Sequence, residues 1–245
     1  AGRLPTVPPG LLVARRAAVN HSIDELRSLV GAYAAQGITN ILALRGDPPG
    51  DPLGEWVRHP RGLTYAEELV RLIRDLGDFH VGVASFPEGH HRAPDLEQDT
   101  RALVDKLRAG AEDSITQDFF DVEHYLRLRD RLAAADSEQA AKPLIPGIMP
   151  ITSLASVRKM VSLSGSVIPG DVEARLAAAA GTGDQEDRAA VRAVGIDLAT
   201  EWAQRLIAEG APCLHFCSLN FAKASTEVLA RLGVDITSAV PVVAG

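Results

Sequence analysis

The amino-acid sequence predicts an α/β protein built on a parallel β-sheet. Six short apolar runs are continuous in hydrophobicity, as expected for strands that are covered on both faces. Amphipathic stretches with helix-capping residues separate these runs, and such a β-helix-β alternation implies parallel strands. The chain has 245 residues, close to the length of about 250 residues typical of a (β/α)8 barrel. Because only six strands are recognisable, periodicity alone leaves both an incomplete barrel and a doubly wound open sheet as interpretations.

The predicted strands and helices follow one another along the chain. The strands are 11–19 (LLVARRAAV), 39–44 (TNILAL), 80–86 (HVGVASF), 114–120 (SITQDFF), 144–149 (LIPGIM) and 213–219 (CLHFCSL). The helix starts are Ser22 with Glu25, Thr64 with Glu67, Asp95 with Gln98, and Asp121, and the glycine stops are Gly37, Gly77 and Gly110. Segments 47–62 and 177–188 lack this pattern, and we interpret them as surface segments of a single domain, 1–245.

The composition is that of a soluble globular protein and argues against a nucleic-acid-binding or membrane protein. Hydrophobic residues make up 46% and charged residues 23% of the chain, and the formal net charge is −7. No clustered basic face is present to neutralise phosphates. No apolar run approaches the roughly 18 to 20 residues of a membrane span, and the N-terminus lacks the apolar core of a signal peptide. We therefore expect a cytoplasmic protein with small-molecule partners.

The only two cysteines, Cys213 and Cys217, frame the sequence CLHFC. Together with His215 they would share one face of a strand, a pattern that suggests a zinc site. At about 3.3 Å per residue the two sulfurs lie roughly 13 Å apart, which is too far to share one tetrahedral ion. We expect small buried thiols and no metal site.

Polar groups cluster where the predicted strands end, in LRGD, SFPEGHH, ITQDFFD and FCSLN. The carboxyl ends of parallel strands carry the chemistry of barrel enzymes. Asp47 is followed by Pro-Pro-Gly, which is good turn chemistry by itself, so a purely structural role stays open. Gln117 can both donate and accept hydrogen bonds. Buried in the core, its amide would need hydrogen-bond partners there, so a purely structural role is less favourable. Gln117 is therefore the strongest substrate-binding candidate.

A set of motifs in fixed order makes the chain resemble one known family. ALRGDPPGD, GLTYA, FPEGH, DKLRAGA, ITQDFFD, IPGIMPIT and LHFCSLN, between about Val13 and Val234, are similar to the bacterial methylenetetrahydrofolate reductases. The resemblance implies a (β/α)8 TIM-type barrel and a non-covalent FAD. It also implies reduction of 5,10-methylenetetrahydrofolate to 5-methyltetrahydrofolate by NADH or NADPH, a step of one-carbon metabolism toward methionine. A homo-oligomer is compatible with it.

The resemblance also implies the roles of particular residues. Flavin-binding positions are Arg45, Gly46, Asp47, Tyr65, Ala66, Phe86, His90, Ala93, Asp99 and Lys106. Asp47 and Gln117 are implied as the catalytic, substrate-binding pair that holds the pterin. Two ordinary structural interpretations remain beside these roles: Tyr65 as a first-turn aromatic that covers the barrel, and Lys106 as part of a solvated helix face.

The chain departs from the family pattern at several places. It has no match for the first two barrel strands, the first of which carries the glutamate that is the family's general acid. Arg15 and Arg16 replace a His-Leu pair, Phe221 replaces an arginine that often binds folate, Asp105 replaces an arginine, Asp118 replaces an apolar or aromatic residue, and Phe86 stands where tyrosine is common. His91 has no counterpart and is expected to be an exposed loop residue. Two alternatives to the reductase therefore stay open: a non-catalytic flavin- or folate-binding remnant, and a partial subunit whose open edge pairs with a second polypeptide.

Overall fold

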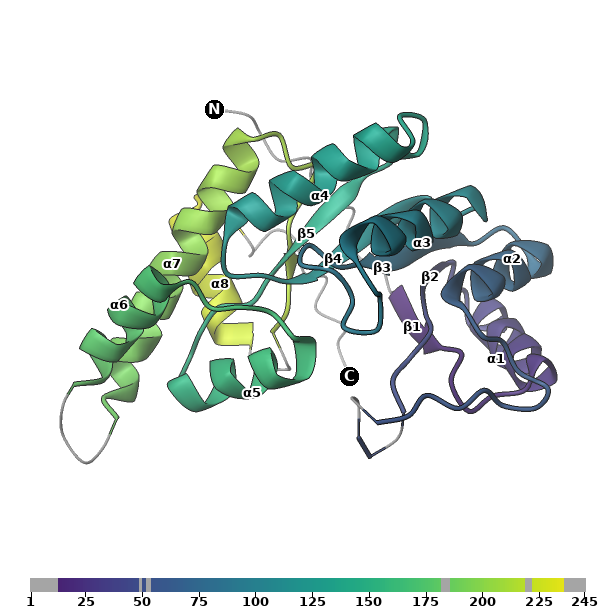
Figure 1. The fold of residues 1–245 in the computed structure, drawn as a ribbon, viewed down its shortest axis with the longest axis horizontal. Helices are drawn as coiled ribbons and strands as arrows, with labels where there is room; N and C mark the ends of the chain where they lie inside the picture. Colours follow the sequence, from purple (N-terminus) through teal and green to yellow (C-terminus); the bar gives the residue numbers. More distant parts are fainter. Residues whose placement is uncertain (1–12, 49, 52–53, 182–185, 219–221, 236–245) are drawn as a thin grey trace. The chain divides into compact units, whose positions relative to one another are not determined.

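The computed structural model describes residues 13–48, 50–51, 54–181, 186–218 and 222–235, shown in colour in Figure 1. Within these ranges the strands are β1 (Val13–Ala17), β2 (Asn40–Leu44), β3 (His80–Ser85), β4 (Asp113–Asp118), β5 (Leu144–Ile148) and β6 (His215–Phe216). The helices are α1 (Ile23–Ala35), α2 (Ala66–Leu76), α3 (Leu96–Arg108), α4 (Val122–Ala135), α5 (Leu154–Ser164), α6 (Gly170–Ala180), α7 (Arg188–Ala208) and α8 (Ala222–Arg231), with a short 3-10 helix at Gln139–Ala141.

The strands are hydrogen-bonded neighbours in chain order from β1 to β6. The pairs β1–β2, β2–β3 and β5–β6 are parallel, and Ala14 lies opposite Ile41 in the first of them. All six predicted strands are confirmed, although β6 has only two residues. A parallel sheet with strands in sequence order is the arrangement of half a (β/α)8 barrel, and among the described residues it does not close.

The chain divides into two compact units, which we describe separately. The first unit contains the described residues up to Ile115 together with Leu128–Leu144. The second unit contains Thr116–Arg127 and the described residues from Ile145 onward. The division falls within β4 and beside the first residue of β5. Whether the whole chain folds as one domain stays a prediction.

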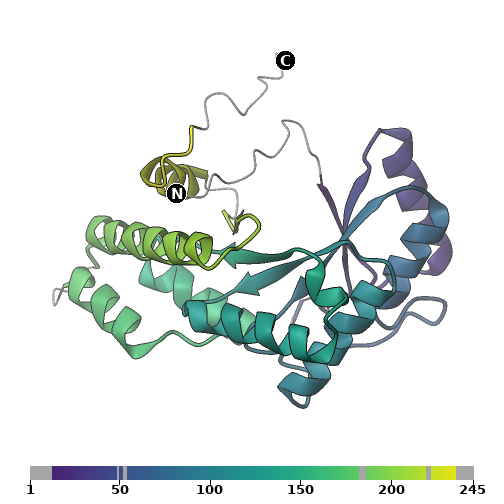
Figure 2. The same cartoon turned by 90° about the horizontal axis from the view of Figure 1, so that it is seen from above.

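In the first unit, α1, α2 and α3 lie on one side of β1–β3 (Figure 2). Sequential parallel strands with right-handed crossovers place every connecting helix on the same face. The apolar residues of the strands and helices meet in the core, which includes Leu26, Val30, Ile41, Ala43, Leu69, Ile73, Val81, Val83, Leu103 and Leu107. Continuous burial along the centre of β2 and β3 explains why their sequences show no polar alternation.

Local capping chemistry sets the helix starts. The predicted box before α1 is confirmed, since Ser22 N–H donates to Glu25 Oε2 at 2.8 Å and Ser22 Oγ accepts from Glu25 N–H at 3.3 Å. The predicted box of Thr64 with Glu67 is wrong. The N-cap is Tyr65, and Glu68 Oε2 accepts from the backbone N–H groups of Thr64 and Tyr65 at 2.5 and 2.9 Å. Glu68 is the third helical residue after Tyr65, so it alone can reach back over that first turn.

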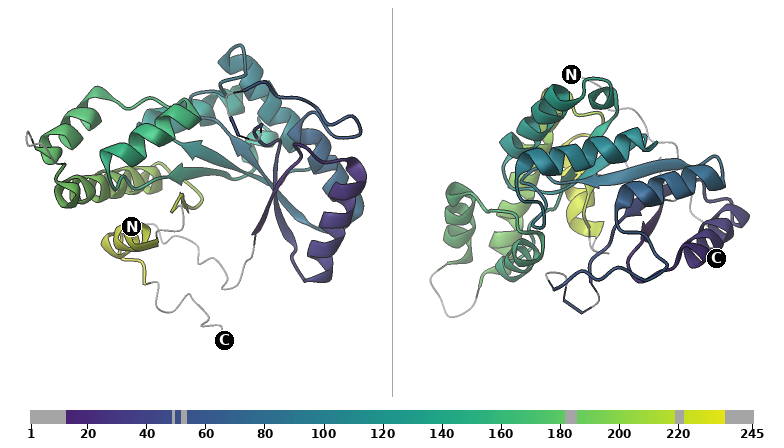
Figure 3. Two further views of the ribbon diagram at one scale, coloured as in Figure 1. Left: turned by 90° about the horizontal axis from the view of Figure 1, so that it is seen from below. Right: turned by 45° about the vertical axis from the view of Figure 1, so that its right-hand side comes forward.

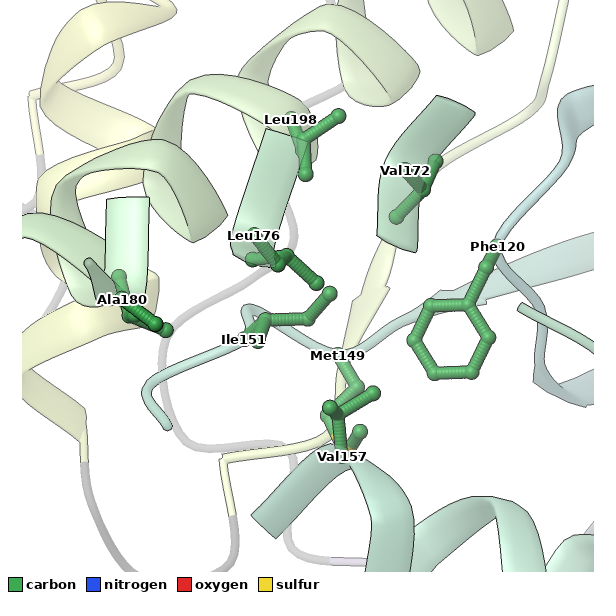
Figure 4. Packing of buried hydrophobic residues seen from close by; sticks show 9 residues of the cluster. Phe120, Met149, Ile151, Val157, Val172, Leu176, Ala180 and Leu198 are labelled. Atoms are coloured by element: carbon green, nitrogen blue, oxygen red, sulfur yellow. The ribbon is translucent and has the colours of Figure 1, made fainter. Parts of the chain in front are cut away.

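The second unit has its own apolar core, shown in Figure 4. Its buried members are Phe120, Met149, Ile151, Val157, Val172, Leu176, Ala180, Val191 and Leu198. Helices α6 and α7 pack side by side (Figure 3). A side chain at Gly195 of α7 would collide with the carbonyl oxygen of Ile151, so glycine allows this close approach.

Our interpretation of 177–188 as a surface segment is wrong at its beginning. Helix α6 continues to Ala180, and that residue is buried in the core of the second unit. The run of alanines lacks the contrast between apolar and polar residues that marks a helix in sequence. Alanine nevertheless has the highest helix propensity, and its small side chain fits a close helix contact.

The described helices include none that combines the length and the apolar character needed to cross a membrane.

Candidate active site

Ten of the residues singled out in the sequence belong to the first unit and lie near the carboxyl ends of β2 and β3. Arg45, Gly46 and Asp47 follow β2 directly, and Phe86, His90 and Ala93 follow β3. Tyr65 and Ala66 stand at the start of α2, and Asp99 and Lys106 on α3. Because parallel strands end at the same edge of a sheet, the fold brings these loops together.

Gly46 fixes the loop after β2 against β1. Its φ angle of 84° lies in the left-handed region that favours glycine. An added Cβ would stand 2.6 Å from the Cβ of Ala17 and 2.7 Å from Cγ1 of Val19. The backbone N–H of Val19 donates to the carbonyl of Arg45 at 2.9 Å. The missing side chain therefore lets the loop pack on β1 and holds Arg45 in place.

Arg45 is half-buried, and its guanidinium carbon lies 5.4 Å from the centre of the Trp56 ring. Burial lowers the pKa of Arg45, the positive charge of Arg92 lowers it further, and Asp47 opposes both. An arginine nevertheless keeps its proton, so a partly desolvated cation remains. Asp47 is exposed, and the buried Nε1 of Trp56 has no hydrogen-bond partner among the described residues.

His90 is held as a neutral imidazole. Its Nδ1 accepts the backbone N–H of Arg92 at 3.0 Å, so the proton of the neutral ring lies on Nε2. Burial, followed by the charges of His91, Arg45, Lys106 and Arg92, lowers the pKa of His90 to about 3. At neutral pH the ring therefore offers one N–H donor and no charge.

Aromatic contacts fix the orientation of the His90 ring. The Phe86 ring meets it edge-on with centroids 4.6 Å apart, and the His91 ring stacks on it at 4.3 Å. The backbone N–H of Ala93 donates to the carbonyl of His90 at 2.8 Å and closes the turn. His91 is exposed, as predicted.

Asp99 and Lys106 tie α3 to this loop. Asp99 is only 7% exposed, and its Oδ1 accepts the backbone N–H of His90 at 3.2 Å. Burial raises the pKa of Asp99, against the opposing effects of that N–H and of Lys106. Lys106 Nζ donates to the carbonyl of Ala84 at 2.5 Å and lies 5.9 Å from the Phe86 ring centre. The interpretation of Lys106 as a solvated helix face is therefore wrong.

Burial also lowers the pKa of Lys106 to about 8, with Asp99 opposing the shift. A lysine with that pKa is mostly protonated at pH 7 and loses its charge as the pH rises through about 8. Asp105, its neighbour, is exposed, and we expect it to repel a nearby phosphate only weakly through solvent.

Tyr65 is 59% exposed. It therefore does not cover the sheet, and its ring is accessible to a ligand beside the first helical residue, Ala66.

Gln117 belongs to the second unit, at the carboxyl end of β4. It is half-buried, and its Nε2 donates to Oδ1 of Asp118 at 2.8 Å. Asp118 is 2% exposed and lies on the buried face of the strand. A buried carboxyl group is costly without a partner, and the amide of Gln117 supplies one.

The other departures are described only in part. The side chains of Arg15 and Arg16 and all of Phe221 lie outside the described residues. Cys213 and Cys217 are half-buried and form no disulfide with each other. The described residues contain no group of three or more His, Cys, Asp or Glu side chains placed to hold a metal ion.

Sequence reasoning missed two members of this site. Arg92 supplies the backbone donor to His90, and its Nη2 donates to the carbonyl of Gly54 at 2.7 Å. Trp56 lies in the segment that we read only as surface. The available signal was a large aromatic residue in the long polar loop that follows β2, since ligand-binding residues concentrate in loops.

The first unit thus gathers three cationic side chains, a neutral imidazole donor and two aromatic rings at the carboxyl edge of a parallel sheet. In an α/β protein, side chains of these kinds can bind an anionic ligand that carries a flat ring system. The chain belongs to the methylenetetrahydrofolate reductase family, whose model matches residues 12–233.

Individual relatives agree with this assignment. The chain is 36% identical over 212 residues to 5,10-methylenetetrahydrofolate reductase of Escherichia coli strain K12, covering 86% of this chain and 66% of that protein. It is 33% identical over 216 residues to the enzyme of the same name from Pectobacterium carotovorum, covering 88% and 67%. Methylenetetrahydrofolate reductase 1 of Schizosaccharomyces pombe is 35% identical over 226 residues, covering 91% and 36%. The chain therefore spans about two thirds of the length of its bacterial relatives.

A solved structure supports the fold. A Clostridium thermocellum protein, described as binding two copies of 5-methyl-5,6,7,8-tetrahydrofolic acid, aligns with a TM-score of 0.53 and 17% identity. The alignment covers 88% of this chain and 70% of that protein.

Proposed function

We propose that the chain binds FAD and a tetrahydrofolate and reduces 5,10-methylenetetrahydrofolate to 5-methyltetrahydrofolate, with NADH or NADPH as the electron donor. The observation that carries the proposal is the linked set Arg45, Phe86, His90, Asp99 and Lys106. These residues come from two loops and α3, stand at positions that the family resemblance assigns to flavin, and interact directly or through their charges. The relatives named methylenetetrahydrofolate reductase support the reaction.

The residues present fit FAD. Arg45, Arg92 and Lys106 provide the positive charge that a pyrophosphate requires, and all three act on the same imidazole. Gly46 provides a loop with no side chain toward β1. The neutral His90 offers an N–H donor without adding a fourth charge. When bound, FAD supplies the chemistry that passes a hydride from the nicotinamide to the one-carbon group of the folate.

The other residues bind and orient the reactants. Asp47 is exposed and next to Arg45, so its carboxylate can accept hydrogen bonds from the amino-pyrimidine edge of the pterin. Gln117 can donate to and accept from the pterin, or the nicotinamide carboxamide when that reactant is bound. Asp99 holds the backbone N–H of His90 and thereby keeps the ring in position. Tyr65 offers an exposed ring at the start of α2.

A flavin titration tests the proposal. Purified protein should be yellow or should take up added FAD, and Lys106→Met should weaken FAD binding at least tenfold because a desolvated cation is lost. Arg71→Ala is the matched control, since Arg71 is an exposed helical cation paired with Glu67 at 3.1 Å. It should leave FAD affinity within about twofold. If the protein binds no FAD at all, both the reductase and the flavin-binding remnant are excluded.

A second measurement separates the reductase from the remnant. Anaerobic NADH or NADPH should remove the colour of the bound flavin if the chain is a reductase. Bound flavin that keeps its colour with both donors would identify a non-catalytic flavin-binding protein. Cytoplasmic location and homo-oligomeric assembly remain predictions beside this function.

A further inference from the structure

Among the described residues, the buried carboxyl group of Asp118 accepts a side-chain hydrogen bond from Gln117, the candidate substrate-binding residue. Asp118 ends β4 and is 2% exposed. Its Oδ1 accepts Nε2–H of Gln117 at 2.8 Å, while its Oδ2 has no partner among the described residues. Adjacent strand residues point to opposite faces, so the two side chains must bend toward each other to make this bond.

The strand end does not depend on this carboxyl group for its anchoring. The main-chain carbonyl of Asp118 accepts Oγ–H of Ser166 at 3.0 Å, and Ser166 Oγ in turn accepts from Ser164 Oγ at 2.9 Å. On the same strand, Thr116 Oγ1 accepts the backbone N–H of Gly147 at 2.8 Å. Main-chain and hydroxyl contacts therefore hold the end of β4, while the carboxyl group of Asp118 bonds to the side chain of Gln117.

Burying this carboxyl group opposes folding. Burial raises the pKa of Asp118, and its own backbone N–H and the amide of Gln117 offset only part of that effect. An apolar side chain of similar size in this place would avoid the cost of desolvating an acid. The carboxyl group therefore acts through its hydrogen bond to the Gln117 amide rather than through a gain in stability.

A fixed acceptor determines which way a glutamine amide points. A free amide can exchange its oxygen and nitrogen by rotation and so presents no fixed order of donor and acceptor. With one N–H of Gln117 committed to Asp118, the Oε1 acceptor and the second N–H keep defined places. A ligand with a matching donor and acceptor then binds without the cost of ordering that side chain.

We propose that Asp118 is a positioning residue that fixes the amide of Gln117 in the orientation that binds the pterin of the folate. This role rests on the proposed function, since it requires Gln117 to contact the folate. Asp118 itself does not need to touch the reactants.

A double-mutant cycle on the flavin-loaded protein tests the role, with 5-methyltetrahydrofolate as the probe and its dissociation constant as the readout. Asp118→Leu should weaken folate binding about tenfold, equivalent to about 1.4 kcal/mol. Asp118→Asn keeps an acceptor oxygen for Gln117 and should stay within about twofold of the wild type. In a Gln117→Leu background, Asp118→Leu should change the constant less than twofold.

Ser166→Ala is the matched control. It removes the hydroxyl that anchors the same strand end, so it should lower the melting temperature and leave folate affinity within about twofold. Asp118→Leu should instead weaken folate binding without loss of stability. If Asp118→Leu does not fold, Asp118→Ala takes its place in the cycle.

The outcomes separate this role from the proposed function. Wild-type protein that binds no folate would end the proposed function and the role with it. Wild-type protein that binds folate, with Asp118→Leu equally tight, would overturn the positioning role alone. Equal effects of Asp118→Leu with and without Gln117 would also overturn it, because the carboxyl group would then act independently of the amide.

Discussion

Replacing Gly46 by alanine should destabilise the protein more than replacing other glycines with the same backbone conformation. A non-glycine residue at a φ of 84° costs about 1–2 kcal/mol of left-handed strain. The new Cβ would also stand 2.6 Å from Ala17 Cβ, which has no rotamer to change, so the backbone of β1 must move. Such overpacking costs about 1–3 kcal/mol more. The total loss is about 2–5 kcal/mol of unfolding free energy.

Two glycines provide the matched controls. Gly37 and Gly50 have φ angles of 74° and 86°, and an added Cβ at either would meet nothing within 4 Å. Their alanine variants should therefore lose only the strain, about 1–2 kcal/mol, in urea unfolding followed by tryptophan fluorescence. Gly46→Ala should also weaken FAD binding, because the loop that carries Arg45 must shift. Stability of Gly46→Ala equal to that of Gly37→Ala would refute the close packing of this loop on β1.

Three further predictions concern charge. FAD affinity should fall as the pH rises through about 8, where Lys106 loses its proton, and Lys106→Arg should remove this dependence in a titration at several pH values. Burial opposes protonation of His80, but its bonds to Asp113 and Glu112 raise its pKa overall. The stabilisation by His80 is complete below its unfolded pKa of about 6.5 and is lost as the pH rises through the higher folded pKa. The free energy of unfolding in urea should therefore fall by less than about 1 kcal/mol over this pH range, and His80→Asn should show no such fall. Asp47→Asn should leave the melting temperature unchanged because Asp47 is exposed, yet weaken 5-methyltetrahydrofolate binding about tenfold; unchanged binding would exclude Asp47 from the folate site.

The parts of the fold that depend on local chemistry were predictable from the sequence. The capping box of Ser22 and Glu25 and the cap at Asp95 involve residues three positions apart, and both are confirmed. At α2 the predicted box of Thr64 with Glu67 is wrong, because the helix starts one residue later, at the N-cap Tyr65, which is not a residue that the capping pattern predicts. The alanine-rich end of α6 was missed because its burial depends on α7, far along the chain.

Part of the membership of the candidate site was predictable, but its chemistry was not. The family motifs placed Phe86, His90, Asp99 and Lys106 near one another, and their mutual contacts agree with that placement. The neutral state of His90 follows from a backbone N–H of Arg92 and from burial, neither of which a motif encodes. Likewise, the bond between Gln117 and Asp118 joins side chains that simple strand alternation separates.

We propose that this chain holds a flavin that exchanges electrons with both a nicotinamide and a folate. The most direct measurement is an anaerobic pair of half-reactions on the FAD-loaded protein, followed by the flavin absorbance. We expect NADH or NADPH to remove the flavin colour and 5,10-methylenetetrahydrofolate then to restore it with formation of 5-methyltetrahydrofolate. Colour that the nicotinamide removes but the folate does not restore would exclude 5,10-methylenetetrahydrofolate as the electron acceptor.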